Sequence, residues 1–160
     1  MRPQRTRSRV RGAFIKLEAL AAMEAQTKLV ELALAEAVMH QMQATWLALI
    51  RQIADSQGIK PESVSSLSDL VICLKDRNLI SVEANELRRI LADPDSWASL
   101  MSAEYIDVTC PQELQFSNAS NAIPSLDRSG LTAIRVDRYR SWIDELRLLI
   151  ESMQSRFDEF

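Results

Sequence analysis

The sequence is poor in the residues that tight turns, metal sites and covalent cross-links require. Its 160 residues include 3 glycines, 5 prolines, 2 cysteines and 1 histidine. So little glycine and proline argues against a turn-rich β-sandwich. The glycines at 12, 58 and 130 are isolated, so the glycine-rich loop of a P-loop or Rossmann nucleotide site is absent.

The cysteines and the histidine give no metal pattern. Cys73 and Cys110 are too far apart in sequence for a zinc motif and too few for a disulfide framework, so we expect reduced thiols and a cytoplasmic protein. His40 alone cannot complete a usual zinc site, and Glu36 precedes it by four positions, not by the three of di-iron bundles. We predict no metal and no cofactor.

Long uncharged apolar runs are also missing. No stretch approaches the roughly 20 apolar residues that a membrane-spanning helix needs, so we expect no membrane span. The composition is instead 47% apolar and 26% charged, which suits long helices with charged outer faces. We therefore predict an all-α fold: a single-domain bundle of about five to six helices.

Two long helices, over residues 27–56 and 132–157, carry apolar stripes with alternating spacings of three and four, typical of helices packed in a bundle. We expect these stripes to pack against each other, and Trp142 and Leu149 widen the second one. The first stripe is Leu32, Ala35, Met39, Met42, Trp46, Leu49 and Ile53, and the second is Val136, Tyr139, Ile143, Leu146, Ile150, Met153 and Phe157.

Shorter helices should fill the sides of the bundle. The first begins between Thr6 and Gly12 and ends near Ala25, and it either stops there or continues into the helix at 27–56. Others are predicted over 66–77, capped by Ser65 or Ser66, from a Ser81 cap to Ala92, and from Pro94 to Asp107. Residues 108–130 show no sustained period and are predicted to form one long loop.

Charge is distributed unevenly. The net charge is −3, but residues 1–12 carry five arginines and no acid, so the rest of the chain carries −8. We treat residues 1–12 as a basic arm that precedes a bundle over residues 13–160. Because cations oppose the dipole at a helix start, the arm either frays or is held by acidic partners. The arginines of this arm are Arg2, Arg5, Arg7, Arg9 and Arg11.

The arm is the candidate contact for nucleic acid or an acidic partner. Its arginines alternate, so on a helix they spread over more than half of the circumference, and no aromatic residue for base stacking precedes Phe14. The alternative is a solvated or intramolecularly paired segment. A second basic set, consisting of Arg128, Arg135, Arg138, Arg140 and Arg147, is interspersed with acids and predicts a salt-bridged face.

Catalysis has one weak candidate. His40 lies just off the apolar stripe, where Glu36 can hydrogen-bond to it. However, residues 33–44 contain no serine, threonine or cysteine to act as a nucleophile. Paired carboxylates such as Asp93 with Asp95 sit at helix ends or on polar faces. We therefore expect no enzyme activity and no catalytic residues.

The middle of the chain resembles HEPN-type helical bundles. The resemblance rests on LSDLVICLKDRNLISVE at 67–83 and LRRIL at 87–91. In those families this region leads into an Arg-x4–6-His motif that serves as a nuclease or nucleotide-binding centre. Here the segment Asp93–Trp97 stands at that place and the motif is absent, so the resemblance implies a helical bundle without that site.

The whole chain also resembles a family of uncharacterised helical proteins from Pseudomonas and related bacteria. The resemblance rests on the basic start leading into Lys16-Leu-Glu, the 32–53 helix, LADPDSW at 91–97 and YRSWIDEL at 139–146 with Arg156-Phe157. It implies a bacterial cytoplasmic bundle. The function we predict is a non-enzymatic protein–protein interaction or accessory module that binds a protein partner or a second copy of itself. The alternative is a nucleic-acid-associated protein that uses the arginine-rich arm.

The predicted core yields a stability test. Trp46→Ala should lower the free energy of unfolding by about 3–5 kcal/mol, and Ile143→Ala by about 2–5 kcal/mol, because each leaves a cavity in the core. Thermal or urea melts followed by circular dichroism measure both changes. Unchanged melting after either substitution would contradict the proposed core.

Overall fold

The computed structural model describes residues 3–109 and 129–159, and this part of the chain folds into six α-helices and one short 3-10 turn without β-strands. The all-α prediction is therefore confirmed. The elements are α1 (Pro3–Ala21), α2 (Lys28–Ser56), η1 (Pro61–Ser63), α3 (Leu67–Asp76), α4 (Val82–Ala92), α5 (Trp97–Thr109) and α6 (Ser129–Asp158).

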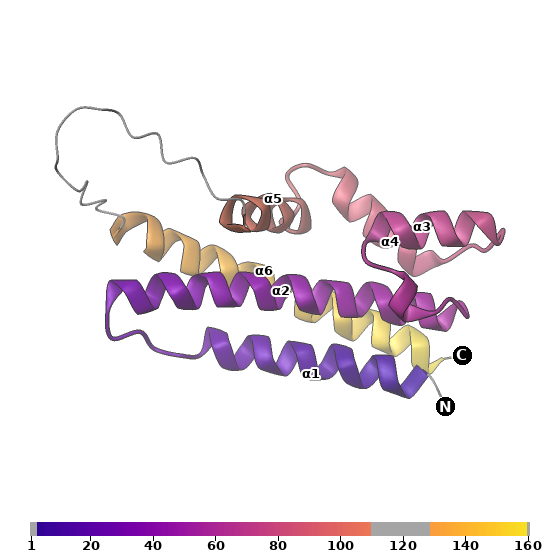
Figure 1. Cartoon of the computed structure of the whole chain (residues 1–160), viewed down its shortest axis with the longest axis horizontal. Coiled ribbons are helices and arrows are strands. Elements are labelled where there is room, and N and C mark those ends of the chain that lie inside the picture. Colours follow the sequence, from indigo (N-terminus) through magenta and orange to yellow (C-terminus); the bar gives the residue numbers. More distant parts are fainter. Residues whose placement is uncertain (1–2, 110–128, 160) are drawn as a thin grey trace.

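Helix α2 lies at the centre of the arrangement. Figure 1 shows α1 folded back along α2 as an antiparallel hairpin, with α6 running beside both. The pairing of α1 with α2 is the most extensive between any two elements, and α3, α4 and α5 pack along other parts of α2. The start of α1 and the end of α6 meet at the same end of the molecule.

The helix ends follow local sequence. Thr27, Ser66 and Ser81 cap α2, α3 and α4 with hydroxyl oxygens that accept backbone N–H bonds of 3.1–3.2 Å. Helix α2 ends at Ser56, and Gly58 follows with a φ of +70°, so that the Ile59 N–H returns to the Ala54 carbonyl at 2.9 Å. This Schellman arrangement needs a left-handed residue, which glycine adopts without strain.

Both predicted apolar stripes are found in the core. From Met39 to Ile53 the predicted α2 positions are buried, and on α6 the positions from Tyr139 to Met153 are buried together with Trp142 and Leu149. Leu32, Ala35 and Phe157 are half-buried, and the side chain of Val136 lies outside the described residues. The indole of Trp46 meets that of Trp97 edge to face, with ring centroids 5.8 Å apart.

One polar pair lies within the contact between α2 and α6. The side-chain amides of Gln52 and Gln154 exchange two hydrogen bonds, of 2.7 Å and 3.2 Å. Gln52 is 5% exposed, so its amide is taken out of water and satisfied by its partner.

The first helix differs from the prediction. It starts at Pro3 and ends at Ala21, and residues 22–27 separate it from α2, so the two helices are distinct. Residues 3–12 of the predicted arm are thus the first half of α1. The reason is burial: Thr6 and Val10 are 4% and 0% exposed, and the Thr6 hydroxyl donates to Asp55 Oδ2 at 2.8 Å.

Two further boundaries differ. Pro94 is not in the first turn of α5; it lies in the turn that precedes the helix, whose start at Trp97 is capped by the Ser96 hydroxyl. The predicted loop at 108–130 is helical at both edges, because α5 extends to Thr109 and α6 begins at Ser129. The remainder of that range lies outside the described residues.

Candidate functional site

The arginines that the sequence singled out lie on the first turns of α1, except for Arg2, which is outside the described residues. At 100° per residue, Arg5 and Arg9 fall on one side of the buried line that α1 turns toward the bundle, and Arg7 and Arg11 fall on the other. The alternate spacing therefore produces two separate basic pairs and no continuous basic face.

Arg7 is bound to the end of the chain. Its guanidinium donates two hydrogen bonds to the carboxylate of Asp158 on α6, one of them 2.8 Å long. This bidentate contact lowers the pKa of the Asp158 carboxyl, through hydrogen bonds first and charge second, and raises the pKa of Arg7. The expectation that acidic partners hold the arginines is thus met at Arg7.

Arg5 and Arg9 line a concave region beside the end of α2, which we call the basic cleft. Its volume is about 400 Å³. Arg9 lies 3.6 Å from Glu62, and both side chains are largely exposed. Arg5 and Lys60 have no ion pair within the described residues. The polar residues of the cleft are Arg5, Thr6, Arg9, Asp55, Lys60 and Glu62.

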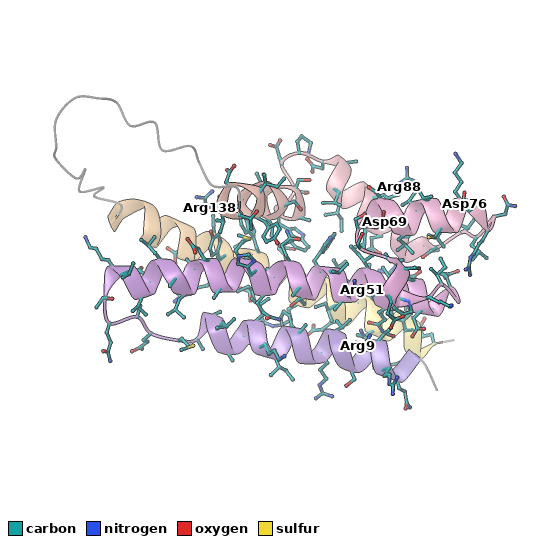
Figure 2. The ribbon with its side chains drawn as sticks, in the orientation of Figure 1. Arg9, Arg51, Asp69, Asp76, Arg88 and Arg138 are labelled. Atoms are coloured by element: carbon teal, nitrogen blue, oxygen red, sulfur yellow. The ribbon has the colours of Figure 1, made fainter. Side chains whose placement is uncertain are left out.

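A smaller hollow continues from the basic cleft between α1 and α2. It measures about 180 Å³ and is lined by Arg9 and Thr6 from α1 and by Arg51 and apolar residues from α2. Figure 2 shows Arg9 and Arg51 on facing helices. Arg51 is fixed by its Nε–H, which donates to the Val64 carbonyl at 2.9 Å.

The opposite end of the hairpin carries a different feature, which we call the hairpin groove. It is a depression of about 420 Å³ between the α1–α2 hairpin and α6. Carboxylates of Glu24 and Glu31 stand on the hairpin side, and the guanidinium of Arg140 stands on the α6 side. Its apolar residues include Leu20, Met23, Leu34, Ala35, Val38 and Ile143.

The hairpin groove exists because α1 is shorter than α2. The helices have 19 and 29 residues, which at about 1.5 Å per residue gives a difference of about 15 Å. The Thr6–Asp55 contact aligns the first turn of α1 with the last turn of α2, so the whole difference falls at the hairpin end. There the linker at 22–27 replaces a helix beside the first turns of α2, which are left partly exposed, with Leu29 77% and Val30 44% exposed.

His40 is exposed on α2, at the edge of a depression of about 500 Å³ between α2, α3 and α5. Its ring meets the ring of Tyr105 edge to face at 5.4 Å. The predicted contact with Glu36 is not among the hydrogen bonds and ion pairs of the described residues. Ser65, Ser66 and Ser68 border the same depression, but Ser65 donates to the Asp69 carboxylate and Ser66 caps α3.

The second basic set is paired in part where it is described: Arg147 and Arg140 have acidic partners, and Arg138 is exposed without an ion pair within the described residues. Arg147 donates to Asp144 at 2.6 Å and to Glu18 of α1 at 3.0 Å, and it lies over the ring of Phe14. Arg140 lies 4.0 Å from Asp137. Arg128 and the side chain of Arg135 are outside the described residues.

Residues 3–109 and 129–159 show neither a metal-ligand cluster nor a helix suited to a membrane. There, no three histidine, cysteine or acidic side chains gather in an arrangement suited to a metal ion. Cys73 is a half-buried free thiol, and Cys110 is outside the described residues. In the same ranges, no helix is long and apolar enough to cross a membrane.

Sequence reasoning missed the basic cleft and the hairpin groove. The basic cleft needs Lys60 and Glu62, 50 or more positions from the arginines, and no local pattern connects them. The hairpin groove depends on where α1 ends, and the sequence suggested an end near Ala25. The one available signal was Glu24, a charged residue at the position where the apolar face of α1 would continue after Leu17 and Ala21.

Comparison with known proteins shows the family of the chain. The model of a family of unknown function, DUF6586, matches residues 5–159, nearly the whole length, and the chain belongs to this family. No curated protein and no solved structure matches the chain. The match does not bear on HEPN-type bundles or on a bacterial source, so those resemblances stay predictions.

The contact between α1 and α6 leads to a pH prediction. The Asp158 carboxyl should titrate below its ordinary pKa of about 3.9 in the folded protein, and Arg7→Gln should return it toward that value. Because the folded pKa is depressed, the stabilisation is present above the ordinary pKa and is lost as pH falls through the folded pKa. Carboxyl chemical shifts measured by NMR test this, and an Asp158 titration unaffected by Arg7→Gln would contradict it.

Proposed function

We propose that this member of the family is a non-enzymatic protein-interaction module that binds a short helix of a partner protein in the hairpin groove. The observation that carries the proposal is the uncovered length of α2. A helix with an apolar face can lie in a groove of this kind, as in other helix-in-groove complexes. About 15 Å of missing cover corresponds to roughly three helical turns.

The surface around the groove supports this proposal. Met23, Leu29 and Val30 are 58%, 77% and 44% exposed next to the groove, at the turn of the hairpin. Apolar side chains that gather at a concave surface commonly mark an interaction site. A partner helix that continues over the hairpin turn would cover these side chains as well.

The charges at the rim define the partner further. Glu24 and Glu31 face a partner from the hairpin side, and Arg140 faces it from α6. A complementary helix carries basic residues along the edge that faces the hairpin and an acidic residue along the edge that faces α6. Such an arrangement fixes the direction of the helix in addition to attracting it.

The experiment is site-specific photo-crosslinking in the cells that make the protein. A photoreactive residue at Met23 lies at the groove, and the matched control is Ile106 on α5, which is equally exposed at 58%. We expect an adduct from position 23 with one helical segment of a partner protein and none from position 106. Leu34→Glu should remove the adduct by placing a charge in the groove, whereas Ile72→Glu, at a 57% exposed site on α3, should not.

Melting of both variants by circular dichroism shows that the fold is kept. Equal adducts from positions 23 and 106 would contradict the proposal. An adduct only with a second copy of this chain would also contradict it, because the groove would then be a self-association surface.

A second candidate function is nucleic-acid binding through the α1 arginines. Its support is that Arg5 and Arg11 are exposed and have no ion pair within the described residues. The geometry is less favourable than the sequence suggested, because the two lie on opposite sides of the buried line of α1. Removing residues 2–11 is not a clean test, since Thr6 and Val10 are part of the core.

Side-chain replacement tests this second function without that loss. If α1 binds phosphates, the protein is retained on heparin at low salt, and Arg5→Gln combined with Arg11→Gln elutes at a lower salt concentration. Arg88→Gln on α4 is the control and should elute unchanged. Passage of the unmodified protein through heparin at low salt would end this candidate.

A further inference from the structure

The basic cleft carries more positive charge than its surroundings neutralise. Arg5, Arg9 and Lys60 contribute three cations, and only Arg9 has an ion pair within the described residues. Its 3.6 Å distance to Glu62 is long, and the two side chains are 57% and 74% exposed. Ion pairs of that kind contribute little to stability, so an incoming anion can replace Glu62 at small cost.

Other arginines of the molecule show the contrast. Arg156 lies 2.5 Å from Glu86, and Arg147 is held by two carboxylates. The protein as a whole is acidic, with a net charge of −3. Three cations around one hollow, two of them without an ion pair within the described residues, are therefore a local excess of positive charge in an acidic chain.

The first turn of α1 adds to the positive electrostatic potential of the basic cleft. A helix start carries partial positive charge from its unpaired N–H groups, and α1 has no acid in its first turn to balance it. Arg5 lies in this turn and adds a like charge. An anion in the basic cleft would offset both the positive end of the α1 dipole and the charge of Arg5. The electrostatic energy of the cleft is therefore lower with a bound anion than without one.

We propose that the basic cleft binds a small molecule through a phosphate group. Of the two carboxylates in the cleft, Asp55 accepts the Thr6 hydroxyl and only Glu62 pairs with one of the three cations. A phosphate monoester carries up to two negative charges and three strong acceptor oxygens, so it can contact several of these cations at once. The volume of about 400 Å³ falls in the range of small-molecule sites. Arg5 and Arg9, one helical turn apart on α1, hold the phosphate from one side and Lys60 holds it from the α2–η1 connection.

An extended nucleic acid fits this site less well. Asp55 and Glu62 line the same cleft, so they would repel the neighbouring phosphates of a polymer. The lining includes no aromatic side chain on which a base could stack. The other basic pair of α1 lies across the buried line, where Arg7 is occupied by Asp158.

Calorimetric titration with pyrophosphate and with inorganic phosphate tests the proposal on the full chain, with sodium chloride keeping the ionic strength constant. We expect saturable binding of pyrophosphate, weakened about tenfold or more by Arg9→Gln or Lys60→Gln, because each removes a charged hydrogen bond. Arg88→Gln is the matched control: Figure 2 shows this arginine on α4, away from Arg9, and its loss should leave binding unchanged.

Three results would overturn the proposal. The first is no saturable binding of either anion. The second is equal weakening by Arg9→Gln and Arg88→Gln, which means diffuse attraction. The third is a single-stranded oligonucleotide that displaces pyrophosphate and binds more tightly, which assigns the cleft to nucleic acid. The hairpin groove lies at the other end of α1, so a lack of anion binding in the basic cleft would not affect the photo-crosslinking test of the groove.

Discussion

The packing of α2 against its neighbours is the interaction on which the rest of this structure depends. Its buried stripe from Met39 to Ile53 contacts α1 on one side and α6 on another, while α3, α4 and α5 pack along the remaining surface. Both candidate sites are consequences of this central position. The basic cleft forms where α1 begins beside the end of α2, and the hairpin groove forms where α1 stops before α2 does.

Much of the fold followed from the sequence because the signals were local. The three-and-four spacing placed α2 and α6 to within a few residues, and Ser81 marked the start of α4 because a hydroxyl can satisfy the free N–H groups there. The start of α1 was misplaced for the opposite reason. Thr6 and Val10 are buried by partners far along the chain, and the arginines around them favoured an exposed segment.

The candidate sites were less accessible to sequence reasoning than the helices. The arginines were identified and their spread around a helix followed from their alternate spacing, but the contact between Arg7 and Asp158 depends on the path of α6. Likewise, the length of the hairpin groove is a difference between two helices, so an error of four residues in the end of α1 is enough to conceal it. A binding site that arises from the difference in length between two helices is not marked by any local sequence motif.

The paired amides of Gln52 and Gln154 have a consequence for how uniquely the bundle assembles. Apolar stripes that repeat every three or four residues can interlock again after one helix slides along another by a turn. In a shifted alignment the two amides would no longer face each other, and a buried polar group such as the Gln52 amide costs about 1–3 kcal/mol when it has no partner. The two glutamines thus favour one alignment of α2 and α6 over alignments shifted by a helical turn. This preference keeps the ends of the bundle, where both candidate sites lie, in a single arrangement.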